Sequence, residues 1–169
     1  NYDNIVELSS EKQGICRETI TITNTMYSAA RHMEQAIIHI NGFIKKLDER
    51  TFYDEFKITD DNYNRDGLLQ SPWRNLFETD LKKAKTVVFI GYSLKYDQEL
   101  VRCIANLNIK DKCVFIDCNS LGEDDEFKIK RYGTLYKIGT TGFAQEILEV
   151  AKNYKPNEKM IELSGFEKR

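Results

Sequence analysis

A glycine turn near the middle of the chain has the residue types of a nucleotide-binding site. The segment from Thr86 to Asp97 reads TVVFIGYSLKYD, so an apolar strand ends on Gly91 and is followed directly by an amphipathic helix. Such a turn in an α/β sheet places small residues and free helix N–H groups beside a ligand at the carboxyl edge of the strands. Phosphate or ribose is the natural ligand there, although any strand-to-helix junction benefits from a glycine and a capping aspartate.

The composition disfavours several classes of protein. The 169 residues carry 25 Lys and Arg against 27 Asp and Glu, without a basic stripe that contains interleaved aromatic residues. Direct nucleic-acid binding is therefore not expected. No apolar run approaches the roughly 20 residues that span a bilayer, and no signal segment is expected. We expect one soluble, cytoplasmic globular domain with no membrane partner.

The cysteine pattern disfavours a zinc site. The cysteines are widely and irregularly placed, at Cys16, Cys103, Cys113 and Cys118. No Cys-x-x-Cys pair occurs, so a structural zinc ribbon has no ligands to use. We therefore expect buried, reduced thiols and no zinc.

Hydrophobic periodicity predicts alternating helices and strands in the second half of the chain. Strands are expected at 86–90, 113–117 and 134–138, and helices at 72–85, 98–107, 123–131 and 143–154. Strands that alternate with helices of this length form parallel βαβ units. The predicted fold class is therefore α/β, with a doubly wound and mostly parallel sheet.

The first third has a weaker pattern. Residues 19–23 alternate like an exposed strand or a hairpin arm, and residues 37–40 form a short apolar strand. Residues 28–36 fit either a helix or an irregular loop, and residues 57–59 fit a short strand.

Four short motifs occur in an order that resembles one family. They are Asn1-Tyr2-Asp3, His39-Ile40-Asn41-Gly42-Phe43, residues 59–63, and Gly91-Tyr92-Ser93-Leu94 with Asp97. In this order and at roughly this spacing, they resemble the sirtuin-like domains of bacterial antiphage defence proteins. The resemblance reaches to about Leu148 and implies a Rossmann-like fold that uses NAD as its substrate.

The resemblance implies a role for each matched residue. Asn1 matches the asparagine that positions the nicotinamide ribose and the attacking water, and Asp3 matches the acidic residue that supports it. The implied catalytic residues are Asn1 and His39. The implied NAD-binding residues are Asp3, Asn41, Gly42, Gly91, Tyr92, Ser93, Asp117, Asn119 and Phe143.

Within that set, the matched segments contact different parts of NAD. Gly91 and Ser93 match the turn that contacts the ribose and phosphate portion. The strand end at 117–119 resembles the place where the adenosine half rests. Residues 139–143 resemble the loop and helix start that close over the adenine side.

The chain departs from the family pattern in two places. The Gly-rich strand-turn-helix that should precede the asparagine motif and cradle the pyrophosphate is missing. We therefore expect a fragment of a longer polypeptide, in which residues 1–154 form the C-terminal portion of the domain and 155–169 form a charged tail or the start of a following region.

The second departure concerns the catalytic base. When the family motif is aligned on Gly42, the catalytic histidine falls on Asn41, and His39 matches a second histidine two residues earlier. Residues two apart in a strand face the same side, so His39 is able to stand in for the missing base. The alternative is that His39 is a satisfied core histidine.

The chemistry needs few groups. Cleavage of the nicotinamide–ribose bond passes through an oxocarbenium-like centre, so the protein must hold the ribose, exclude stray water and admit one water. An asparagine amide and a histidine suffice for this. A deacylase also needs an acyl-lysine channel, and the zinc module of the true sirtuins has no cysteine pairs here. Hydrolysis of NAD is therefore favoured over deacylation.

Three functions remain as alternatives. The first is an NAD hydrolase that depletes NAD in an infected cell, either as a homo-oligomer or with a partner such as an ATPase or translocase, an Argonaute or a sensor. The second is a module without catalysis that binds NAD or ADP-ribose or assembles partner chains, which the residue at Asn41 supports. The third is an unrelated doubly wound nucleotide-binding domain of the Toprim-like or receiver-like kind.

Overall fold

The computed structural model describes residues 2–22, 36–54, 56, 67–92, 94–95, 97–118 and 120–154. The expectations for residues 28–35, for 57–63 and for the segment from 155 onward lie outside these ranges, as do those for Asn1, Ser93 and Asn119.

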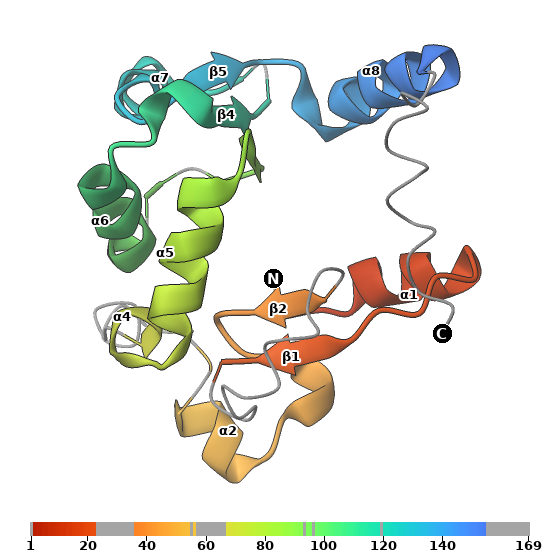
Figure 1. Ribbon diagram of the computed structural model, residues 1–169, viewed down its shortest axis with the longest axis vertical. Coiled ribbons are helices and arrows are strands. Elements are labelled where there is room, and N and C mark those ends of the chain that lie inside the picture. The colour runs from red at the N-terminus through yellow and green to blue at the C-terminus, as the bar shows by residue number, and fades with distance from the viewer. Residues whose placement is uncertain are drawn as a thin grey trace, which may run out of the picture.

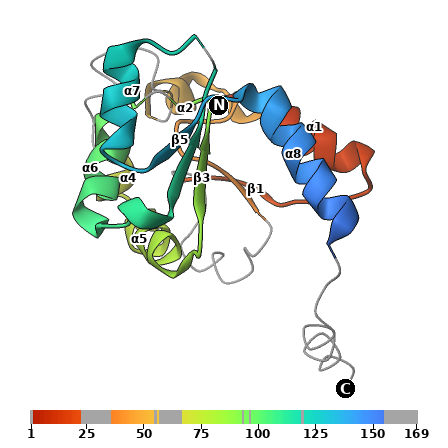
Figure 2. The same cartoon turned by 90° about the horizontal axis from the view of Figure 1, so that it is seen from above.

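The second half of the chain forms a parallel three-stranded sheet covered by helices. Its strands are β3 (Val87–Ile90), β4 (Cys113–Ile116) and β5 (Thr134–Tyr136), in the order β3-β4-β5. Its helices are α5 (Trp73–Lys83), α6 (Gln98–Leu107), α7 (Glu123–Lys130) and α8 (Gly139–Asn153), and a 3-10 turn, η3 (Lys110–Lys112), precedes β4. Figure 2 shows α6 and α7 on one side of this sheet and α8 on the other. The predicted α/β fold class is confirmed.

The first third forms a smaller unit around two more parallel strands. It contains α1 (Ile5–Lys12), β1 (Thr19–Thr21), β2 (Ile37–His39), η2 (Ile44–Lys46), α2 (Glu49–Asp54) and α4 (Gly67–Gln70). β1 pairs with β2 so that Thr21 lies opposite His39. Figure 1 shows α1 and α2 on different sides of this strand pair.

The prediction of an exposed strand or hairpin arm at residues 19–23 is wrong. Ile20 and Thr21 in β1 are 1% and 0% exposed, and β1 pairs with β2 in parallel, so these two described strands do not form a hairpin. The strand is buried because Ile20 and Ile22 pack in a cluster with Leu68 and Trp73, while the Thr19 hydroxyl donates a hydrogen bond to Glu7 in α1 at 3.4 Å.

Helix α5 connects the two units. Trp73, at its first turn, belongs to the core of the smaller unit, and Leu81, in its last turn, belongs to the core around β4. Phe77 lies between them and packs against both clusters. Full burial of a side chain of this size stabilises a fold by about 1.5–3 kcal/mol, so α5 is fixed at both ends.

Two predicted helix starts need correction. Gly91 is not followed directly by a helix, because α6 begins only at Gln98, and Leu94 between them has a positive φ of 57°. Asp97 caps α6, since its carboxylate accepts a hydrogen bond from the Leu100 N–H at 3.2 Å. Helix α8 begins at Gly139 rather than at Phe143, so the segment 139–143, expected to be a loop and a helix start, is helical throughout.

The expectation of buried thiols holds for only half of the cysteines. Cys103 and Cys113 are buried, and burial raises the pKa of the Cys103 thiol to about 11. Cys16 and Cys118 are exposed, because they lie in connections rather than in the core. All four cysteines are free.

None of the helices in the described ranges combines the length and the hydrophobicity that crossing a membrane requires.

Candidate functional site

The segment after Asn1 lies against the turn that follows β2. The Tyr2 carbonyl accepts a hydrogen bond from the Ile44 N–H at 2.8 Å, and the Tyr2 ring stacks on Phe56 with centroids 5.2 Å apart. The Asp3 carboxylate accepts a hydrogen bond from the N–H of Ile5, the first residue of α1, at 3.1 Å. The asparagine motif and the His39–Phe43 motif are therefore joined through their neighbours.

His39 is buried and bonded to a residue that the motifs did not include. Its Nε2 lies 2.6 Å from Glu7 Oε1, and both side chains are 7% exposed. On the other side its ring stacks on Phe43, with centroids 4.3 Å apart and planes at 27°. These contacts give His39 the surroundings of a satisfied core histidine, which was the alternative to the role of base.

The Glu7 carboxylate is held in its charged form. Burial on its own raises the pKa of this group, but the hydrogen bond and the charge of His39, a backbone hydrogen bond and the Thr19 hydroxyl outweigh it. The pKa of Glu7 is therefore lowered from its ordinary value. The pair is an ion pair whenever the imidazole is protonated and a charge-assisted hydrogen bond otherwise.

The two-residue spacing predicted that Asn41 and His39 lie on the same face of a strand. This prediction is wrong. Strand β2 ends at His39, and Asn41 lies in the turn that follows. Its side-chain oxygen is buried and has no hydrogen-bond partner within the described part of the chain. A buried oxygen acceptor without a donor is costly, so this atom is suited to accept a hydrogen bond from a ligand.

Position 42 requires a glycine because of its backbone conformation and because of the nearby Phe56 ring. Its φ is +98°, a conformation that side chains with a Cβ rarely adopt. A Cβ at this position would lie 2.9 Å from the Phe56 ring. The glycine therefore lets the turn after β2 lie directly on Phe56, which also stacks on Tyr2.

The second group of predicted residues lies at the carboxyl ends of β3, β4 and β5. The Gly91 N–H donates to the Ile116 carbonyl at 2.9 Å, and the Asp117 N–H donates to the Tyr136 carbonyl at 3.1 Å. The Gly139 N–H donates to the Asp117 carbonyl at 2.9 Å. Gly91, Asp117 and Gly139 therefore follow one another along the edge where open α/β sheets bind ligands.

This edge offers two glycines that face open space. A Cβ built at Gly91 or at Gly139 would meet nothing within 4 Å, and both residues have positive φ values of 62° and 67°. The Asp117 carboxylate bonds to the backbone of the next residue, since it accepts a hydrogen bond from the Cys118 N–H at 2.7 Å. Close approach of a ligand to the backbone is therefore possible at both glycines.

Tyr92 has contacts of a structural kind. Its ring packs beside Phe89 with centroids 5.9 Å apart, and its hydroxyl donates to the Asp97 carbonyl at 3.5 Å. The side chain thus braces the loop between β3 and α6 and belongs to the edge of the core around β4.

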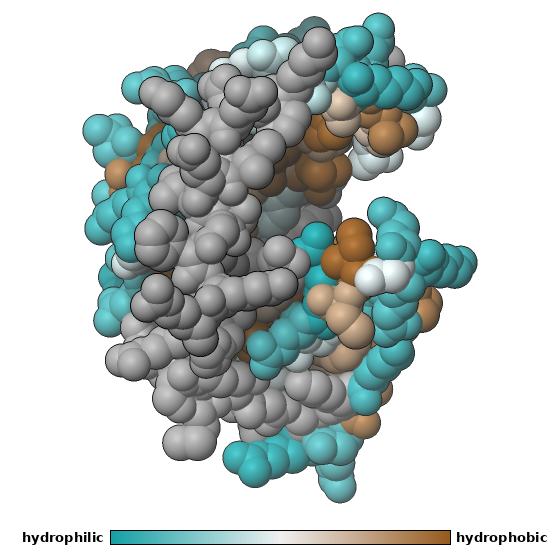
Figure 3. Space-filling model, turned by 45° about the vertical axis from the view of Figure 1, so that its right-hand side comes forward, coloured by the Kyte–Doolittle hydropathy of each residue, from teal (hydrophilic) through white to brown (hydrophobic). Residues whose placement is uncertain are grey.

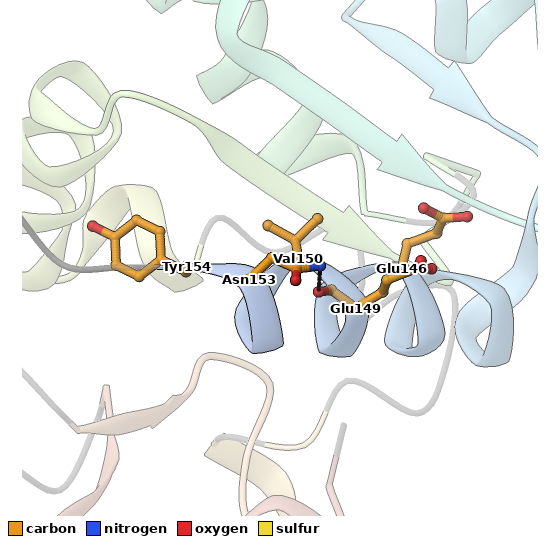
Figure 4. Close-up of a pocket in the computed structure, with 5 residues that line it drawn as sticks. All are labelled: Glu146, Glu149, Val150, Asn153 and Tyr154. Carbon is orange, nitrogen blue, oxygen red and sulfur yellow. Dashed lines mark hydrogen bonds between the residues drawn. The ribbon is translucent and has the colours of Figure 1, made fainter.

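Phe143 lies at a hollow along α8. This hollow of about 360 Å³ is lined mainly by apolar side chains from the same helix. Figure 4 shows a neighbouring open hollow of about 440 Å³ lined by Glu146, Glu149, Val150, Asn153 and Tyr154, in which Asn153 donates to the Glu149 carbonyl at 3.1 Å. In Figure 3 hydrophobic side chains lie on both sides of a recess between the parts of the surface formed by α8 and by α1.

Sequence reasoning missed Glu7 as a member of the site. The residue is four positions after Asp3, which is the spacing of one helical turn, but α1 was not among the predicted helices. The hydrophobic pattern does not mark this helix, because its buried residue is the carboxylate of Glu7.

The comparisons identify the first two thirds of the chain. A model of the SIR2-like domain matches residues 1–112. This range contains the asparagine motif, Glu7, the turn after β2 and the Gly91 turn, whereas Asp117, Asn119 and Phe143 lie beyond it. No curated protein and no solved structure gives a significant match.

Proposed function

Because the chain belongs to the SIR2-like domain family, whose domains use NAD, we propose that it hydrolyses NAD to nicotinamide and ADP-ribose. Residues 1–154 are proposed to be the C-terminal portion of the hydrolase domain, and a Gly-rich segment before Asn1 completes the cofactor site. The absence of paired cysteines leaves the zinc module of the true sirtuins without ligands, which favours hydrolysis over deacylation.

One observation carries this proposal. The hydrogen bond from the Ile44 N–H to the Tyr2 carbonyl, at 2.8 Å, joins the residue next to Asn1 to the turn that presents Asn41 and Gly42. The backbone next to Asn1 in the sequence is thus attached to the stretch of chain that follows Asn41 and Gly42. Groups fixed in this way can hold a ribose and orient a water.

The reaction needs no more than this arrangement provides. The C1′–N bond to nicotinamide breaks, its electron pair leaves with nicotinamide, and positive charge develops at C1′. One water then adds its oxygen to C1′ and loses a proton to the surrounding solvent, which gives ADP-ribose. In the proposed site, Asn1 orients this water and the ribose, Asp3 supports Asn1, and Gly91 with Ser93 and Tyr92 borders the ribose and phosphates.

The biological role is proposed from the motif resemblance. Depletion of NAD by such a domain halts the metabolism of an infected cell, so we propose a cytoplasmic antiphage effector that acts by abortive infection. The domain is proposed to act as a homo-oligomer or with a partner such as an ATPase or translocase, an Argonaute or a sensor.

A second candidate is a module that binds NAD or ADP-ribose without cleaving it. Two observations favour it. The residue in the family position of the base is Asn41, whose amide does not accept a proton at neutral pH. The nearby imidazole of His39 is already bonded to Glu7 at 2.6 Å.

The two candidates are distinguished with the full-length polypeptide that contains this chain and its upstream segment. We expect it to release nicotinamide from NAD, and Asn1→Ala to abolish release while NAD still binds, as measured by chromatography and by calorimetry. Tight binding of intact NAD under activating conditions would favour the binding module instead. A polypeptide that neither binds nor cleaves NAD would overturn both.

A further inference from the structure

Glu7 joins three elements of the smaller unit. Its Oε1 lies 2.6 Å from His39 Nε2 in β2 and accepts a 3.4 Å hydrogen bond from the Thr19 hydroxyl in β1. Glu7 itself belongs to α1, in which it is the buried residue. One carboxylate oxygen therefore connects the helix that follows the asparagine motif to both strands.

This arrangement is poorly explained by stability alone. Buried ion pairs are often no more stabilising than well-packed apolar residues of similar size, because both charges lose their hydration. The second carboxylate oxygen of Glu7, Oε2, is also buried and has no hydrogen-bond partner within the described ranges. The fold thus retains a buried charged group at a kind of position where apolar side chains are often as favourable.

The pair fixes the strand end that precedes Asn41. His39 is the last residue of β2, and it is held by Glu7 on one side and by the Phe43 ring at 4.3 Å on the other. Asn41 lies between these two residues in the chain, in a turn whose next residue has a φ of +98°. These contacts fix the chain on both sides of Asn41.

The Asn41 side-chain oxygen is a hydrogen-bond acceptor to which no described residue donates. It is buried, and it has no partner among the residues that the structure describes. A ribose hydroxyl is a donor of suitable size and polarity, and it carries no charge that would need a counter-ion. A neutral amide oxygen suits this donor over a wide pH range.

We propose that Glu7 is a positioning residue, which acts through His39 to hold the Asn41 side-chain oxygen where it accepts a hydrogen bond from a ribose hydroxyl of NAD. This assignment rests on the function proposed above. His39 then serves as the link between Glu7 and the turn, and its imidazole takes no proton from the attacking water.

The test compares NAD with analogues that lack one hydroxyl of the nicotinamide ribose, in the full-length polypeptide. We expect Glu7→Gln to lower kcat/KM for NAD by roughly 10–100-fold, the loss seen when partners that orient ligand-holding residues are changed at metal sites. Asn41→Ala should cause a similar loss. For the analogue that lacks the contacted hydroxyl, both substitutions should have much smaller effects, because the bond that they weaken is already absent.

Control variants separate positioning from general damage. Glu11→Gln changes an exposed carboxylate on the same helix and should leave activity unchanged. Ile22→Val weakens the neighbouring core and should lower the melting temperature without discriminating between NAD and its analogues. If Glu7→Gln does not fold, Thr19→Val removes only the 3.4 Å hydrogen bond to Glu7 and allows the same comparison.

The outcomes are decisive. Equal losses for NAD and for every deoxy analogue would reduce Glu7 to a structural role and overturn the proposal, as would normal activity in Glu7→Gln. If the polypeptide binds NAD without cleaving it, the Kd values of NAD and its deoxy analogues are compared instead of kcat/KM. The role of Glu7 is then tested even if the hydrolase proposal fails.

Discussion

The ring of Phe56 occupies the space that a side chain at Gly42 would need, since a Cβ on Gly42 would lie only 2.9 Å from the ring. Phe56 also stacks on Tyr2, with centroids 5.2 Å apart. One aromatic ring therefore lies beneath both segments that carry the proposed ribose-binding groups.

Gly42→Ala should be strongly destabilising. The positive φ of Gly42 disfavours any residue with a Cβ, by about 1–2 kcal/mol, and contact with Phe56 adds to this cost. Urea denaturation measures the loss. Phe56→Leu in the same chain should recover the steric part only, and Gly122→Ala, at an open position with negative φ, should change stability much less.

Glu7 should make folding stability depend on pH in the acidic range. Its pKa is lowered from the ordinary value of 4.5, so the folded state favours the charged form and the stabilisation is fully present above that value. The stabilisation is lost as the pH falls through the lower folded pKa. Urea denaturation at a series of pH values should therefore show the difference between the wild type and Glu7→Gln shrinking on acidification. A difference that grows as the pH falls would contradict the Glu7–His39 contact, and Glu11→Gln is the matched control.

Asp97 should stabilise α6 as its N-cap. Its carboxylate accepts the Leu100 N–H at 3.2 Å, and replacing such a cap by alanine costs about 1 kcal/mol. Asp97→Ala should therefore lower the melting temperature, while Asp97→Asn should retain most of the stability. Because Asp97 also ends the loop that begins at Gly91, Asp97→Ala should weaken NAD binding in calorimetry. Unchanged stability in Asp97→Ala would rule out the cap.

The four thiols should react in two classes. Burial raises the pKa of Cys103 to about 11 and also raises the pKa of Cys113, and the thiolate is the reactive form. Iodoacetamide at pH 8 should therefore label Cys16 and Cys118 in the native protein and the other two only after unfolding. Peptide mass spectrometry reads out each site. Rapid labelling of Cys103 in the folded protein would contradict its place in the core.

The elements that were predicted well from the sequence carry a short apolar run or a clear apolar helical stripe. Strands β3 and β4 and helix α6 are of this kind, and their predicted bounds agree with the structure within one residue. Periodicity fails for α1, because Ile5, Val6 and Leu8 are exposed while Glu7 is buried. A pattern that reads hydrophobicity cannot find a helix whose inward face is a carboxylate.

The candidate site was predictable as segments but not as contacts. The motifs identified His39, Asn41 and Gly42, and the match to the SIR2-like domain includes all three. The hydrogen bond between His39 and Glu7 joins residues 32 positions apart, and no local spacing rule links such positions. The local sequence around His39 therefore cannot show whether its imidazole is bonded to another side chain or available for catalysis.

Helix α5 sets the spacing between the two halves of the molecule. Trp73 and Leu81 anchor its two ends in different cores, and each helical residue contributes about 1.5 Å of length and about 100° of rotation. Adding or deleting a single residue between these anchors would turn one sheet against the other as well as shift it. The eleven residues of α5 therefore set both the distance and the relative rotation between the Gly91 turn and the Gly42 turn, and any molecule that contacts both turns must fit them.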